Sequence, residues 1–163
     1  MTIGANSFTV AGETLSRVLT TPVWIGPAFN PAISPPPPGS QYTGIWDTGA
    51  SASVITEKVI AECGLKPIGL ARAHGADGEY LTEVYLISLG VPNGITWNSM
   101  RVTKGKLAAG SEMLVGMDVI GQGDFAVSNY EGRTCFSFRF PSAERIDFTG
   151  KSHLPDKTPP PSG

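Results

Sequence analysis

The sequence predicts an all-β fold with one or two short helices, and three observations support this prediction. Short apolar segments alternate with turn residues along most of the chain. Gly and Pro number 20 and 14 among 163 residues, which is high for a globular chain but below the range of disordered sequences. Only two segments carry helix signals. A chain of this length can form one domain with a buried core.

The expected strands are short and are separated by turns. Residues 8–10 and 15–19 are predicted to form a hairpin around Ala11-Gly12. A long strand at 81–89 is followed by a turn, so that 95–102 can return antiparallel. The remaining strands are predicted at residues 23–25, 42–46 and 134–140; in the last one Phe136, Phe138 and Phe140 share one face.

Two segments are predicted to be helical. Residues 56–63 have Thr56 as the expected N-cap, Glu57 in the first turn and Gly64 directly after the end. The second helix is a short turn at 117–120. These elements predict a chain that is mostly strand.

The prolines divide the chain. Ten of the fourteen fall between Pro27 and Pro38 or in the tail from Pro155 to Pro161. Successive prolines favour polyproline II and cannot donate ladder hydrogen bonds. We therefore expect one domain over residues 1–150, with a proline-rich loop at 27–41, and a disordered tail at 151–163. Either proline segment could instead be a ligand for an SH3-like partner.

Charge and composition exclude several classes of function. The formal charge is −2, with 12 basic and 14 acidic side chains, which argues against a nucleic-acid partner. No run of eighteen apolar residues and no signal-peptide pattern is present, so we expect a cytoplasmic protein without a membrane partner. With two cysteines, Cys63 and Cys135, a reduced pair is the favoured interpretation and a single disulfide remains open.

One acidic motif follows the apolar strand at 42–46, in the order Asp47, Thr48, Gly49, Ala50 and Ser51. An Asp at a strand end is ordinarily a turn residue. Here the glycine allows a sharp bend beneath the acid, the threonine supplies a hydroxyl, and the two small residues leave room for a second backbone. This combination favours a loop with a specific role over an ordinary turn.

This motif resembles the active-site loop of the retropepsin-like aspartic proteases. Further along, residues 112–120 resemble the apolar-apolar-Gly segment of that family and its short helix, with Leu114, Val115 and Gly116 as the supporting second loop. Residues 123–129 resemble its closing strand, and the resemblance extends over residues 23–140. It implies an acid-protease fold of closed, barrel-like sheets. The proline-rich loop and the segment after Asn129 depart from the pattern, which leaves the dimer-forming strands open.

The resemblance also implies a mechanism with two carboxylates that share one proton around a water molecule; such pairs titrate as a unit. The chain holds one Asp-Thr-Gly. A homodimer in which each chain contributes Asp47 would complete the pair, with each Thr48 hydroxyl reaching the partner loop. The substrate would be a polypeptide.

A flap is expected over the site, because water must be excluded and an extended peptide held. The candidate segment contains five residues with a small or polar character: His74, Gly75, Ala76, Asp77 and Gly78. An ordinary exposed hairpin turn has the same composition, and this alternative stays open.

Other chemistry is not expected. Two histidines, His74 and His153, and two cysteines without C-x-x-C spacing do not suggest a metal site, and no cofactor is implied. The sequence thus predicts an aspartic endopeptidase. A catalytically silent dimerisation or peptide-binding module of the same fold is the alternative, and a self-processing domain of a larger polyprotein is a third.

Overall fold

The computed structural model describes residues 6–75 and 78–149, and it confirms the all-β prediction. The strands are β1 Asn6–Ala11, β2 Leu19–Pro27, β3 Ser40–Trp46, β4 Val54–Ile55, β5 Gly69–Gly75, β6 Gly78–Val91, β7 Ile95–Lys104, β8 Met113–Val115, β9 Asp124–Ser128 and β10 Cys135–Phe140. The α-helices are α1 Glu57–Glu62 and α2 Met117–Ile120, and the 3-10 turns are η1 Pro92–Gly94 and η2 Tyr130–Gly132. No helix in the described part is long and apolar enough to cross a membrane.

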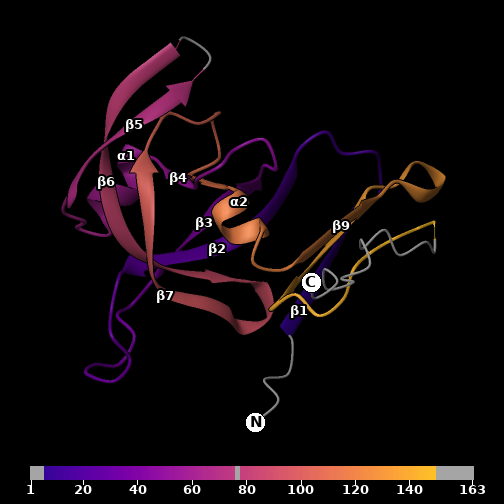
Figure 1. Cartoon of the computed structure of the whole chain (residues 1–163), viewed down its shortest axis with the longest axis horizontal. Coiled ribbons are helices and arrows are strands. Elements are labelled where there is room, and N and C mark those ends of the chain that lie inside the picture. The colour runs from indigo at the N-terminus through magenta and orange to yellow at the C-terminus, as the bar shows by residue number, and fades with distance from the viewer. Residues whose placement is uncertain (1–5, 76–77, 150–163) are drawn as a thin grey trace, which may run out of the picture.

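The larger sheet closes on itself (Figure 1). Its strand order is β2-β3-β8-β4-β7-β6, and β2 pairs again with β6, which completes a closed barrel. The barrel interior is apolar: Val23, Ile25, Ile87 and Met113 are all fully buried. Among the described strands β5 pairs only with β6, so the β5–β6 hairpin extends beyond the barrel wall.

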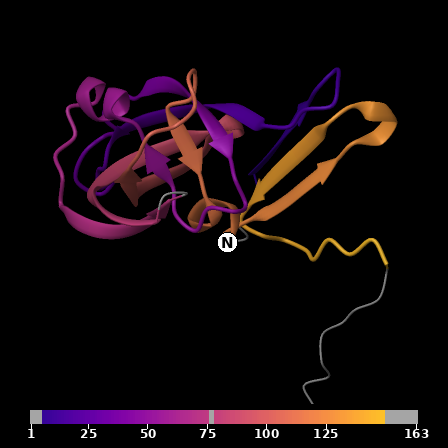
Figure 2. The same cartoon turned by 90° about the horizontal axis from the view of Figure 1, so that it is seen from above.

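The second sheet has the order β1-β10-β9 and extends to one side of the barrel (Figure 2). Its buried face carries Phe8, Phe136 and Phe138, whose rings surround Trp46 at the end of β3 with centroid distances of 5.6, 6.0 and 5.0 Å. This aromatic cluster packs the second sheet against the barrel at Trp46, the residue that precedes Asp47.

Several predicted elements are confirmed. The two helices lie where the sequence placed them, although Thr56 makes no side-chain hydrogen bond as the cap of α1. β6 and β7 form the predicted antiparallel pair. Phe136 and Phe138 are buried on one face of β10, and Phe140 packs against the same core.

The predicted hairpin of residues 8–10 with 15–19 is wrong. β1 pairs antiparallel with β10, Phe8 opposite Phe138, while residues 12–18 form a connection to β2. Pairing with β10 buries the Phe8 ring in the aromatic cluster, whereas a hairpin of residues 8–10 with 15–19 would leave this ring without buried neighbours. The short strands β4 and β8 are additional to the sequence prediction.

The proline-rich segment forms an irregular loop over residues 28–39, between β2 and β3. It helps to enclose an apolar pocket of about 390 Å³, together with Trp24 and Trp97. The predicted tail at 151–163 lies outside the described residues.

Candidate active site

Asp47 follows the last residue of β3 and begins the loop that leads to β4. Its backbone N–H donates to the carbonyl of Val115, at 3.0 Å, so the acid is fixed against a strand distant in sequence. Its carboxylate oxygen Oδ1 accepts the N–H of Gly49, at 2.8 Å. A Cβ at position 49 would lie 3.1 Å from that same oxygen, so a larger residue there would press on the Asp47 carboxylate. The turn therefore holds the carboxylate partly exposed at its surface.

The two predicted loops come together in space. β3 pairs in parallel with β8, which places Trp46 opposite Val115. Beyond the strands, the N–H of Met117 donates to the carbonyl of Ala50, at 2.8 Å. The segment from Leu114 to Gly116 therefore supports the Asp47 loop from one side.

Gly116 lies at the tightest point of this contact. A Cβ there would lie 2.8 Å from the carbonyl carbon of Ala52 and 3.0 Å from the carbonyl oxygen of Ala50. Both are backbone atoms and cannot move aside as a flexible side chain can. The glycine is thus required by close packing of the two loops.

A buried hydrogen-bonded network, missed by the sequence analysis, reinforces the contact. Asp118 accepts two hydrogen bonds from Ser53, one from the backbone N–H at 2.9 Å and one from the hydroxyl at 2.7 Å. The Ser53 hydroxyl oxygen in turn accepts the N–H of Gly116, at 3.0 Å. Ser53 is fully buried, so each of these polar groups depends on the others. The only sequence signal was a serine inside a short apolar stretch.

The Asp47 carboxylate opens onto a cavity of about 560 Å³. Its lining combines the active-site loop with the connection before β2 and with β9: Arg17, Val18, Leu19, Ile45, Trp46, Asp47, Thr48, Phe125 and Val127. Thr48 is exposed in the single chain. The acid thus lines a mostly apolar hollow in which Arg17 is the one cation among the described lining residues.

Trp46 supports the Asp47 loop through its own hydrogen bond and ring packing. Its indole N–H donates to the Thr21 hydroxyl at 3.0 Å, and its ring stacks on Phe125 with a centroid distance of 5.8 Å and an interplanar angle of 5°. Trp46 is 5% exposed, so the residue next to the acid is immobilised by packing.

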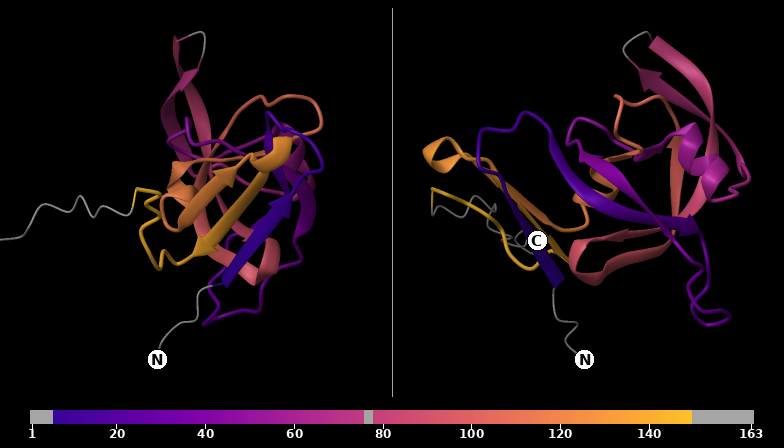
Figure 3. Two further views of the ribbon diagram at one scale, coloured as in Figure 1. Left: turned by 90° about the vertical axis from the view of Figure 1, so that its right-hand side faces the viewer. Right: turned by 180° about the vertical axis from the view of Figure 1, so that it is seen from behind.

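The predicted flap segment lies at the end of the β5–β6 hairpin, where Gly75 pairs with Gly78. Ala76 and Asp77 lie outside the described residues. Figure 3 shows the two strands projecting beyond the rest of the domain. Exposed apolar side chains, Leu70, Tyr80 and Leu81, lie on them. The hairpin is observed, and its role as a flap remains a proposal.

The remaining candidate residues lie elsewhere. Cys63 and Cys135 are free thiols, and Cys63 packs against the core near the Tyr42 hydroxyl, 3.4 Å away. Within residues 6–75 and 78–149 no group of three or more His, Cys, Asp or Glu side chains could hold a metal ion.

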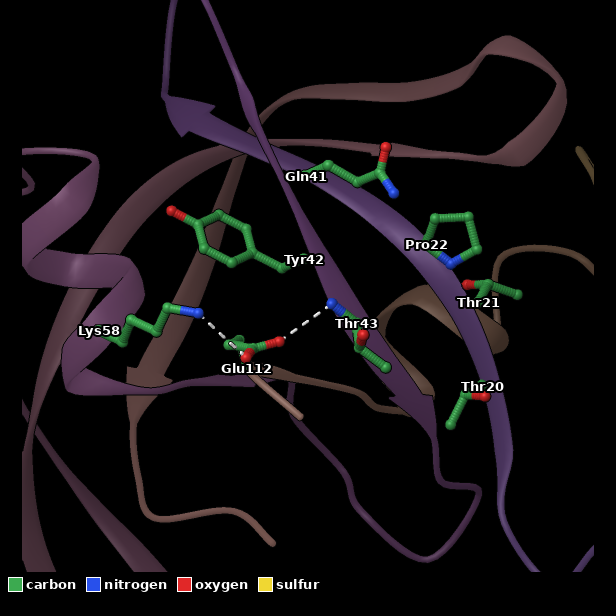
Figure 4. Close-up of a pocket in the computed structure, with 8 residues that line it drawn as sticks. All are labelled: Thr20, Thr21, Pro22, Gln41, Tyr42, Thr43, Lys58 and Glu112. Atoms are coloured by element: carbon green, nitrogen blue, oxygen red, sulfur yellow. Dashed lines mark hydrogen bonds and ion pairs between the residues drawn. The ribbon is translucent and has the colours of Figure 1, made fainter. Parts of the chain in front are cut away.

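A polar hollow of about 530 Å³ lies on the outer side of β2 and β3 (Figure 4). In it Lys58 forms an ion pair with Glu112, at 3.3 Å, and lies over the ring of Tyr42. Burial, with hydrogen bonding to the Cys63 thiol, raises the pKa of the Tyr42 hydroxyl above its ordinary value. Since the carboxylate of Glu112 also accepts the N–H of Thr43, its charge is already compensated within the chain.

Comparison with known families identifies the class. The family model for aspartyl proteases matches residues 38–119, half of the chain, and this span includes the Asp47 loop, the hairpin and β8. The chain therefore belongs to the aspartyl protease family.

Comparison with solved structures defines the fold within that class as retropepsin-like. A retropepsin-like aspartic protease from Rickettsia conorii superposes with a TM-score of 0.54 at 11% identity, covering 85% of this chain and 98% of the other. The foamy viral protease-reverse transcriptase aligns with a TM-score of 0.46 at 22% identity, over 64% of this chain and 12% of that one. Among curated proteins no sequence matches significantly.

Proposed function

We propose that the protein is an aspartic endopeptidase that acts as a homodimer, with Asp47 from each chain forming the catalytic pair. The observation that supports this most strongly is the position of Asp47. It ends a barrel strand, is fixed by Val115 and Gly49, and opens onto a cavity in a chain that holds a single Asp-Thr-Gly.

The two carboxylates would share one proton and hold a water molecule between them. In the first step the ionised carboxylate takes a proton from the water as the water oxygen attacks the peptide carbonyl carbon, and the protonated carboxyl donates its proton to the carbonyl oxygen. The product is a gem-diol that is not attached to the enzyme. In the second step the C–N bond breaks, one diol hydroxyl loses its proton, and the leaving nitrogen gains one.

Two further parts of the chain complete this proposal. The exposed Thr48 hydroxyl is available to reach the partner loop across the twofold axis. The β5–β6 hairpin would close over an extended peptide and exclude water from the pair. Its projecting position and its exposed apolar side chains support this role.

The test is hydrolysis of a denatured protein substrate by the wild type and by Asp47→Asn. An amide cannot accept the proton of the water, so we expect the variant to lose activity by about 10³-fold or more. The matched control is Glu13→Gln, an acid-to-amide change at an exposed position of the connection before β2, which should keep full activity. Wild-type rates in purified Asp47→Asn would contradict the assignment. An inactive wild type would favour the silent binding module.

A further inference from the structure

The apolar pocket beside the proline-rich loop has no part in the proposed function. This pocket of about 390 Å³ lies where β2 ends and β7 begins, beside the loop of residues 28–39 (purple, lower left of Figure 1). Leu19, at the start of β2, lines the Asp47 cavity, whereas Trp24 lines the pocket. Since a strand rises about 3.3 Å per residue, the Cα atoms of Leu19 and Trp24 lie roughly 16 Å apart along β2. A ligand in the pocket therefore leaves the Asp47 cavity open.

The pocket is lined mainly by rings. Two indole rings, one phenyl ring and three prolines take part: Trp24, Trp97, Phe29, Pro31, Pro36 and Pro37. The Trp24 side chain is 40% exposed, although it belongs to a barrel strand whose inward-facing neighbours Val23 and Ile25 are fully buried. Among the described residues that line the pocket none is charged. An uncharged segment with apolar rings therefore suits it.

The walls of the pocket are fixed by contacts outside it. The indole N–H of Trp97 donates to the Gln122 side chain at 3.1 Å, and the Trp97 ring packs on Phe140 with a centroid distance of 5.2 Å. The proline-rich loop is tied to β7 by the N–H of Phe29, which donates to the carbonyl of Asn98 at 3.0 Å. The pocket is thus formed before a ligand enters, which reduces the entropy lost on binding.

Three polar side chains at the pocket have no hydrogen-bond partner among the described residues. They belong to Ser88, Thr96 and Asn98, and their hydroxyl and amide groups can donate. A polyproline II segment has no internal hydrogen bonds, so its carbonyl groups accept from outside. Aromatic-lined grooves recognise such segments by packing against their proline rings. The rings and the free donors together favour a proline-rich ligand.

The chain itself contains such a segment. Residues 158–162 have the sequence Thr-Pro-Pro-Pro-Ser. This stretch is uncharged, like the described lining of the pocket, and the charged residues Asp156 and Lys157 lie just before it. A segment on the same chain is present at a high effective concentration, so a weak intrinsic affinity is enough for it to bind.

The chain is long enough for this segment to reach the pocket. Phe140, the last residue of β10, contacts Trp97 in the pocket wall. From Phe140 the described chain continues for nine residues to Thr149, and residues 150–158 supply nine more before Pro159. Because an extended chain spans about 3.3–3.6 Å per residue, the second nine residues can cover any distance that the first nine have covered. Pro159 can therefore return to Trp97.

We infer that residues 158–162 bind in this pocket of their own chain in a polyproline II conformation, with the proline rings against Trp24 and Trp97. The free hydroxyl and amide groups of the pocket donate to the carbonyl oxygens of the segment. The tail is then held at the end of β2 that lies away from Asp47. This inference does not depend on the proposed function, because the pocket shares no lining residue with the Asp47 cavity.

The first test changes only the tail of the full chain, so the domain folds alike in every protein compared. One protein carries Pro159→Ala, Pro160→Ala and Pro161→Ala together and is called the triple variant. The matched control is Pro155→Ala, a tail proline that precedes the charged pair. All proteins also carry Asp47→Asn, so that hydrolysis cannot remove the tail.

The measurement is the position of the three tryptophan indole N–H signals in the NMR spectrum. The triple variant should shift the signals of Trp24 and Trp97 relative to the parent and leave that of Trp46, which is 5% exposed, unchanged. Pro155→Ala should shift none of them. Identical spectra of the triple variant and the parent would overturn the inference. The signals of the parent should also stay constant on dilution, because signals that move would mean that the tail of a second copy fills the pocket.

A second measurement titrates a synthetic peptide of residues 154–163 into the triple variant, whose own tail no longer competes. The peptide should bind saturably and restore the indole positions of the parent. Adding Trp24→Ala should weaken its affinity at least about 10-fold, as expected when an aromatic contact at the centre of a site is removed. The matched control is Tyr130→Ala, at a 78% exposed aromatic residue of η2, which should bind as before. Equal affinities of the two variants would place the peptide elsewhere and overturn the inference.

Discussion

The loop that carries Asp47 and the β5–β6 hairpin are held in opposite ways. The loop is fixed by backbone and side-chain hydrogen bonds to β8 and α2, and Ser53 within it is fully buried. In the β5–β6 hairpin, Leu70 and Leu81 are each 67% exposed, and the ion pair between Arg72 and Glu79 links its two strands near the turn.

This difference matches what the two regions are proposed to do. A carboxylate that must meet its partner within hydrogen-bonding distance gains from a backbone that cannot shift. A segment that must admit a polypeptide and then cover it needs low local stability. Substitutions in the loop should therefore change global stability, and substitutions in the hairpin should change turnover.

The largest effect is expected from Gly116→Ala. The new Cβ would collide with backbone atoms of Ala50 and Ala52, which can be relieved only by separating the two loops. We expect a loss of about 3 kcal/mol in the free energy of unfolding, measured by urea denaturation. The control is Gly69→Ala in the hairpin, where nothing lies within 4 Å of the position that a Cβ would take, and its effect should stay within about 0.5 kcal/mol. Equal effects of the two variants would refute the comparison.

Removing the Ser53 hydroxyl should have the next largest effect. Ser53→Ala leaves the buried N–H of Gly116 without its acceptor and takes one donor from Asp118, which costs about 1–3 kcal/mol. Thermal or urea denaturation gives the value. Ser99→Ala, at an exposed position of β7, serves as the control and should be close to neutral.

A substitution in the turn of the hairpin should change turnover more than it changes global stability. Gly78 has a φ of +111°, which an alanine adopts only with a strain of about 1 kcal/mol. Gly78→Ala should lower kcat/KM for peptide substrates by roughly 5-fold, because 1 kcal/mol corresponds to that factor. The melting temperature should fall by no more than about 2–4 °C, the shift that 1 kcal/mol produces in a domain of this size. Unaltered kinetics with several peptides would indicate that this hairpin ends in an ordinary exposed turn.

The smallest effect is expected at the base of the hairpin, where Lys104 pairs with Glu57 at 2.8 Å and Glu83 at 3.0 Å. Hydrogen bonds from Lys104 and then Tyr85 hold the pKa of Glu83 below its ordinary 4.5. Because the folded-state pKa is lowered, the stabilisation is present above pH 4.5 and is lost as the pH falls through the folded value.

The measurement is the melting temperature of the wild type and Lys104→Gln between about pH 7 and pH 3, the range over which carboxylates titrate. The difference between the two proteins should shrink in the acidic part of this range. Lys106→Gln, at an exposed position, should show no such trend. A difference that stays constant with pH would show that the charge pairs contribute nothing at the base of the hairpin.

The sequence predicted the parts of this fold that depend on local patterns. Alternation identified β6 and β10, the turn after β6 indicated that β7 returns antiparallel, and capping signals identified α1. Motif resemblance predicted that the Asp47 loop would meet the segment around Gly116.

Contacts between residues far apart in the sequence could not be predicted from local patterns. The partner of β1 lies 128 residues away, where Thr9 and Ser137 share a hydrogen bond, and no local pattern favours that pairing over the nearer residues 15–19. Likewise, no local pattern marks Asp118 as a functional residue. Its role depends on Ser53, 65 residues earlier.

These separations also order events during synthesis. The Asp47 loop cannot acquire its supporting hydrogen bonds until the ribosome has released residues 113–118, and β1 must wait for β10. Contacts between residues so far apart in the sequence form late in folding. The chain loses entropy when it closes the intervening loop, and only then do the contacts stabilise it. A nascent chain therefore carries Asp47 in an unformed loop, and the proposed catalytic site forms only after residues 113–118 and β10 have emerged.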